Sequence, residues 1–161
     1  MKKTIIAALL LMAALSPLKA QKALNLYNKY SDEKGISAVY ISPAMFRLIG
    51  KVPNLELEDG VDISPIIKSL SGMYVLSCEN PQVADRLKED VKKYMNNGKY
   101  ELLLEAKEDG EITRMYTVGN DKIINSFVLM AIEPGETTFI SFEGEIPRDR
   151  LEEAVAKAAS K

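Results

Sequence analysis

The chain has 161 residues, a formal net charge of −2, one cysteine and no histidine. The missing histidine removes the commonest general base and the commonest transition-metal ligand, which excludes a Ser-His-Asp triad and disfavours the usual zinc sites. No basic cluster and no glycine-rich phosphate loop occur, so we expect no nucleic-acid partner, cofactor or metal.

The first twenty residues have the pattern of a secretory signal. Lys2 and Lys3 precede an apolar run of eleven residues from Ile5 to Leu15, which is too short to span a bilayer permanently. We expect cleavage after Ala20 and, because no cysteine lies nearby, no lipid anchor. The protein is therefore predicted to be periplasmic or secreted, without stable membrane insertion once the signal is removed.

Residues 21–161 are predicted to form a single domain, since 141 residues suffice for one hydrophobic core. The leader holds three of the 21 basic residues, so 18 remain against 23 acidic ones and give a net charge of −5. The single cysteine, Cys78, cannot form an intrachain disulfide, and we expect it to be a buried small hydrophobic residue.

The N-terminal half of this domain alternates helices and strands. A helix is expected from Ala23 to about Asp32, and strands are expected over Ile36 to Ser42 and over Gly72 to Glu79. Three polar residues followed by proline predict helix starts, because the polar side chain caps the first turn and proline fits its first position. They are Ser42-Pro43, Ser64-Pro65 and Asn80-Pro81. The two short helices between the strands make a connection long enough for a parallel pair.

The C-terminal half is predicted to be a four-stranded meander followed by a helix from Arg148 to about Ala159. Asp109-Gly110 favours a two-residue hairpin loop. That loop would place Glu105 opposite Arg114, Leu104 opposite Met115 and Leu103 opposite Tyr116. Pro-Gly fits a two-residue hairpin poorly, so we expect a longer loop at Pro134-Gly135, with Phe127 near Phe142 and Leu129 near Ile140.

These elements predict an α+β fold. We expect a single mixed, largely antiparallel sheet, formed by the two N-terminal strands and the meander, with helices packed on one face. The order of the strands in space does not follow from the sequence.

Two short patterns suggest sites and are better explained as surface segments. Ser31-Asp32-Glu33-Lys34 matches the Ser-x-x-Lys of penicillin-binding enzymes, but the companion motifs are missing. "ELEDGVD" offers Glu56, Glu58, Asp59 and Asp62 as oxygen ligands for calcium, but its spacing matches no complete calcium loop, and turns favour the same residue types.

One apolar stripe is a candidate interaction surface. If helices cover only the sheet face with Leu102 and Leu104, the other face would expose an apolar stripe, and such stripes can bind partners. Its residues are Leu103, Ile112, Tyr116 and Val118. The alternative is that a second layer of helix covers the stripe.

The signal, the helix starts, the strand "GMYVLSCEN" with its following helix, and the run "YELLLEAKEDGEITRMY…FVLMAIEPGETTFISFEGEI" together resemble a known family. It is the group of small exported bacterial proteins catalogued as domain of unknown function 4252, found mainly in Gram-negative gut-type anaerobes. The resemblance implies export and a single domain, and it brings no activity or site residues. We therefore expect a non-catalytic exported binding or accessory protein of the envelope. The alternatives are a small carboxylate-dependent hydrolase and a self-associating structural protein.

Overall fold

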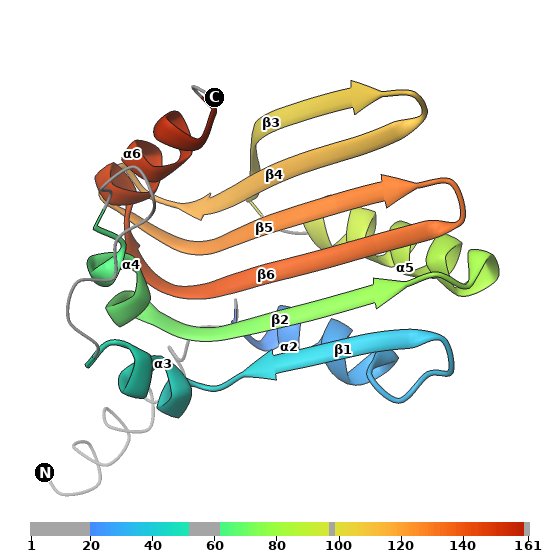
Figure 1. Cartoon of the computed structure of the whole chain (residues 1–161), viewed down its shortest axis with the longest axis horizontal. Coiled ribbons are helices and arrows are strands. Elements are labelled where there is room, and N and C mark those ends of the chain that lie inside the picture. Colours follow the sequence, from blue (N-terminus) through green and yellow to red (C-terminus); the bar gives the residue numbers. More distant parts are fainter. Residues whose placement is uncertain (1–19, 52–61, 97–98, 160–161) are drawn as a thin grey trace, which may run out of the picture.

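A computed structural model describes residues 20–51, 62–96 and 99–159, and it contains a six-stranded sheet in which every neighbouring pair of strands is antiparallel (Figure 1). In spatial order the strands are β1 (Ile36–Ile41), β2 (Leu70–Cys78), β6 (Glu136–Pro147), β5 (Ile123–Glu133), β4 (Glu111–Gly119) and β3 (Glu101–Glu108). The α+β class and the single sheet are confirmed.

The helices in the described part of the chain lie on two sides of this sheet. Figure 1 shows α2 (Ala20–Tyr30) and α5 (Pro81–Asn96) behind the sheet, where both contact β2. The other helices gather at one end of the sheet, on its front side. They are α3 (Pro43–Ile49), α4 (Ser64–Ser69) and α6 (Arg148–Ala159).

The expected parallel pairing of the two N-terminal strands is wrong. β1 and β2 are antiparallel neighbours over the whole of β1, from Ile36 opposite Cys78 to Ile41 opposite Met73. The helices α3 and α4, which lie between them in the chain, stay at one end of the sheet and do not cross over a face. A connection of this kind returns the chain beside the strand that it left, so the direction reverses.

Two of the three predicted helix caps are confirmed. The Ser42 side chain accepts a hydrogen bond from the Met45 amide at the start of α3. The Asn80 side chain accepts from the amides of Gln82 and Val83 at the start of α5. These oxygens satisfy amide groups that have no partner within the first turn of the helix.

The third helix start lies where it was predicted but is capped differently. The Asp62 carboxylate accepts from the Ser64 amide at 2.9 Å, whereas Ser64 itself is the first residue of α4. Hydrogen bonds from Ser64 hold the pKa of Asp62 below its ordinary value. Asp62 therefore has a local structural role, while the other candidate calcium ligands, Glu56, Glu58 and Asp59, lie outside the described residues.

The hairpin between β3 and β4 has the predicted two-residue loop. Asp109 and Gly110 both have positive φ, at 48° and 89°, as the favoured hairpin turn requires. Glu105 pairs with Arg114, and their side chains form an ion pair at 2.7 Å.

The predicted pairing of Leu103 with Tyr116 is wrong because β3 has a bulge at Leu103. Tyr116 pairs with Leu102, and the next pair along the ladder is Leu104 with Met115. Since Tyr116 and Met115 are neighbours in a strand, they point to opposite faces, and so do Leu102 and Leu104.

The loop between β5 and β6 is shorter than expected. Glu133 pairs with Glu136, which leaves Pro134 and Gly135 as a two-residue loop. Gly135 has a φ of 81°, the conformation that glycine supplies after proline in a type II turn. The predicted pairs of Phe127 with Phe142 and Leu129 with Ile140 are confirmed.

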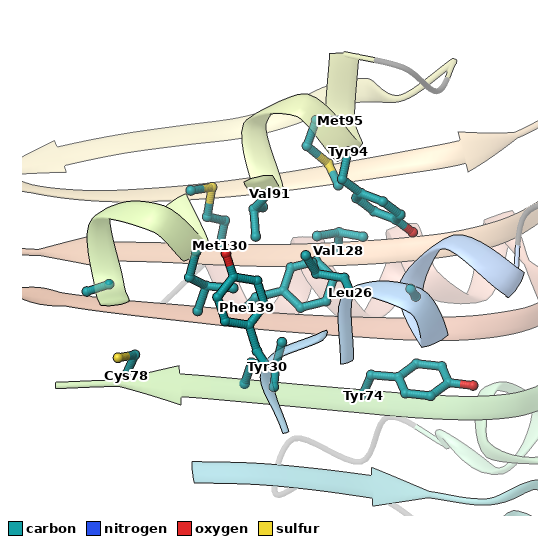
Figure 2. Close-up of a cluster of buried hydrophobic side chains, with 14 of the residues drawn as sticks. Leu26, Tyr30, Tyr74, Cys78, Val91, Tyr94, Met95, Val128, Met130 and Phe139 are labelled. Atoms are coloured by element: carbon teal, nitrogen blue, oxygen red, sulfur yellow. The ribbon is translucent and has the colours of Figure 1, made fainter. Parts of the chain in front are cut away.

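The main hydrophobic core lies between the sheet and the helices α2 and α5 (Figure 2). Leu87 and Val91 of α5 pack there with Leu76 of β2 and Phe139 of β6, and all four side chains are fully buried. Cys78 is also fully buried in this core, as predicted. Within the part of the chain that the structure describes, no helix is long and apolar enough to cross a membrane.

Candidate functional site

The structure places most of the predicted interaction stripe on the helix-covered face. Val118 is buried, and Tyr116 is half-buried against the main core. Ile112 lies on the same face because it follows the alternation of Tyr116 in β4, and Leu103 is the exposed bulge residue. These four residues do not form a bare stripe in this structure.

The opposite face of the sheet is the one that stays open. A single apolar row crosses all six strands on this face, because each residue pairs with the next in the strand register. We call it the apolar row: Val39, Val75, Ile140, Leu129, Met115 and Leu104. None of the six belongs to either hydrophobic core cluster, and each is half-buried or exposed.

The rows on either side of the apolar row differ from each other. Toward the helical end, Met73, Phe142 and Phe127 pack against the second core cluster, which includes residues of α3, α4 and α6. Toward the hairpin end, the next row holds only small side chains: Ser37, Ser77, Thr138, Ala131, Thr113 and Ala106. Figure 1 shows no described helix in front of the sheet toward the hairpins.

Beyond the small side chains lies a row of acidic residues, which we call the glutamate row. Its members are Glu108, Glu111, Glu133 and Glu136, at the ends of the two hairpins. Glu108 pairs directly with Glu111, and Glu133 pairs with Glu136. By the alternation of each strand, all four point to the open face. Among the described residues none of the four forms an ion pair.

The open face is therefore banded along its strands. On β6, the successive open-face residues are Glu136, Thr138, Ile140 and Phe142, and each belongs to a different row. The rows cannot be recognised from the sequence alone, because each strand contributes only one residue to a row. Several strands share the order of acidic, small and apolar residues, but only the register of the strands places equivalent residues side by side.

A second unusual feature is a carboxyl group buried on the helix-covered side of the sheet. Glu143 of β6 is 2% exposed and accepts hydrogen bonds from the hydroxyls of Ser126, at 2.9 Å, and Ser141. Burial raises the pKa of Glu143 to about 7, although the two serine hydrogen bonds oppose this rise. No cation is among the groups that set this pKa.

Two tyrosines extend the hydrogen bonds of this carboxyl group. Tyr100 donates to Ser126 at 3.3 Å, and the hydroxyls of Tyr100 and Tyr94 lie 2.6 Å apart. Burial raises the pKa of both tyrosines, so they stay neutral near neutral pH. Figure 2 shows Tyr94 reaching from α5 toward the sheet. The chemistry available here is hydrogen bonding by one carboxyl group within a closed core, with no second carboxyl group among its partners.

A groove of about 380 Å³ lies between α2 and α5. Lys29 and Lys93 both bind Asp90 within it, and Tyr30 donates to the same carboxylate at 2.8 Å. The hydrogen bond from Lys29 is the largest cause that lowers the pKa of Asp90. These contacts join the two helices. The Ser31-to-Lys34 segment follows α2, and its Glu33 binds Arg86 of α5.

Comparison with known proteins gives a family without an assigned role. No curated protein matches the chain. Among the described residues no group of three or more histidine, cysteine or acidic side chains is placed to hold a metal ion. One family model matches residues 30–154, which is most of the chain and includes the whole sheet. The chain belongs to the family described as a domain of unknown function, DUF4252.

Proposed function

We propose that the protein is a non-catalytic, exported binding or accessory protein of the bacterial envelope, and that it holds a protein partner on the open face of its sheet. The single observation behind this proposal is the apolar row, which crosses all six strands without a described helix over it. Large contiguous apolar surfaces on soluble domains usually mark interaction sites. The N-terminal signal pattern supports the export of the chain.

The geometry favours binding over hydrolysis. A carboxylate-dependent hydrolase needs two acidic side chains in one accessible pocket, one of them with a raised pKa. Glu143 has the raised pKa, but its side chain is closed into the core and faces serine hydroxyls. The open face, by contrast, presents side chains that are already accessible to a partner.

Site-specific photo-crosslinking in the native bacterial host tests this proposal. A benzoylphenylalanine at Leu129, in the centre of the apolar row, should give a defined crosslinked species with another protein. The same group at Lys92, on the outer side of α5, is the matched control and should not give it. The species should disappear when Val75, which lies two strands away in the apolar row, is changed to serine.

Three results would contradict the proposal. Equal crosslinking from Leu129 and Lys92 would show that contact is unspecific, and no crosslinking from Leu129 would show that the face is not occupied. A species with the mass of two copies of the chain would assign the face to self-association, the structural alternative predicted from the sequence.

A further inference from the structure

We propose that the partner presents an apolar surface flanked by lysine or arginine side chains, which pair with the glutamate row. This inference rests on the proposed function and specifies the chemistry of what the open face binds. Its starting point is that the apolar row and the glutamate row lie on the same strands, with only one row of small side chains between them.

Among the described residues none of the four glutamates has a counter-ion, whereas several acidic groups on α5 and β3 do. On α5, Asp85 and Glu89 each bind a lysine three residues further on. On β3, Glu105 binds both Lys107 and Arg114, and these bases lie on the helix-covered face because they alternate with the open-face residues. The glutamate row thus has unneutralised charge on the same face as the apolar row.

The spacing of the bands defines what a partner must offer. Glu133 lies four residues from Leu129 along β5, so the glutamate row is about 13 Å from the apolar row. The glutamate row itself spans four strands, or about 15 Å. The flexible side chains of lysine and arginine can cover much of the distance between the bands. An amphipathic helix of about ten residues has the length of the row, and basic residues at every third or fourth position would line one flank.

A second copy of the chain fits this surface less well. The apolar, small and glutamate rows contain no lysine or arginine, so two open faces would bring uncompensated acidic groups to their interface. Like charges brought together across an interface cost free energy. An anionic lipid surface would be repelled for the same reason.

Titration with a defined peptide tests the inference. The probe is a fluorescent amphipathic helix of about 14 residues, with leucine on one face and lysine on the other, and its counterpart has glutamate in place of lysine. We expect the leucine-lysine peptide to bind the whole protein and its affinity to fall as salt is raised. The leucine-glutamate peptide should not bind.

Two variants with the same change in net charge locate the interaction. The row variant changes Glu108, Glu111, Glu133 and Glu136 to glutamine, and the offset variant changes Asp85 to asparagine and Glu89, Glu152 and Glu153 to glutamine. The row variant should lose about tenfold or more in affinity together with its salt dependence, because four exposed charge pairs are removed. The offset variant should bind as the unmodified protein does.

The same titration separates this inference from the proposed function. A third variant, Leu129→Ser with Val75→Ser, removes apolar side chains from the open face. If it fails to bind while the row variant binds normally, the basic partner is excluded and the open face remains a binding site. If the row and offset variants lose affinity equally, the peptide recognises only net charge and the inference is overturned. If the apolar variant retains binding of the peptide, and the crosslink from position 129 persists in cells when Val75 is changed to serine, the proposed function itself is refuted.

Discussion

The buried carboxyl group of Glu143 predicts a specific dependence of stability on pH. Glu143 lies in the core below α5, and the groups that face it are the hydroxyls of Ser126 and Ser141, with Tyr94, Tyr100 and Tyr74 nearby. Burial raises the pKa of each of these tyrosines, so none becomes charged in the range where Glu143 titrates. The Glu143→Gln substitution keeps the size of the side chain and removes the titration.

The magnitude follows from the difference between the two pKa values. The carboxyl group titrates at about 7 in the folded protein and at its ordinary 4.5 when unfolded. The folded state therefore binds more protons than the unfolded state between these values, so the free energy of unfolding falls as pH rises through this window. The difference between 4.5 and about 7, at about 1.4 kcal/mol for each pH unit, corresponds to roughly 3–4 kcal/mol, lost between about pH 4.5 and 7. Below and above this window the contribution of Glu143 is constant.

Urea unfolding at pH 5, 6, 7 and 8 measures this effect as the difference between the unmodified protein and Glu143→Gln. The variant should gain roughly 3 kcal/mol relative to the unmodified protein between the lowest and highest of these pH values. Glu145→Gln, an exposed site on the same strand, is the control and should show a constant difference. A pH-independent difference for Glu143→Gln would refute the reasoning, because it would mean that the group has the same pKa in both states.

Three further changes test the local structure and the glutamate row. Asn80→Ala removes the cap of α5 and should lower the free energy of unfolding by about 1 kcal/mol in urea titrations; no loss would show that the cap is not needed. Gly110→Ala places a side chain where φ is 89° and should cost about 1–2 kcal/mol in the same assay, although nothing lies within 4 Å of the added carbon; an unchanged midpoint would contradict the turn geometry. The row variant should be more stable by roughly 0.2–1 kcal/mol for each of its two opposed pairs at low salt, and this gain should vanish in molar salt; a loss of stability would reveal a neutralising contact.

Local signals in the sequence predicted the elements of this fold well. Asn80 and Ser42 cap helices because short-range hydrogen bonds determine where a helix starts, and Asp109-Gly110 fixes the register of its hairpin because only a few residue types tolerate positive φ. The pairing of β1 with β2 could not be predicted in the same way. Its direction depends on where α3 and α4 lie, and that is decided by packing between segments far apart in the chain.

The helices cover the sheet face that carries Tyr116, whereas the candidate stripe was expected on the face that they leave open. Strict alternation places Leu102 and Leu104 on the same face, but the extra residue moves them to opposite faces. Leu102 therefore lies on the helix-covered side with Tyr116, while Met115 and Leu104 lie on the open side. A bulge has no sequence signature as strong as that of a turn, so the alternation of residues in β3 could not reveal the face on which Leu102 lies.

The acidic residues at the ends of the two hairpins form one row because of the strand register, which their positions in the sequence do not show. In isolation, acidic residues beside turns are ordinary solvated groups. The register places Glu108 against Glu111 and Glu133 against Glu136, and like charges directly opposite each other destabilise a sheet. Departures from local consistency of this kind are expected mainly at functional sites, where a partner offsets the cost. The glutamate row and the apolar row lie on the same face, separated by one row of small side chains. Exposed apolar surface and unneutralised charge, which both cost free energy, therefore occur on a single surface, and a basic amphipathic partner would relieve both.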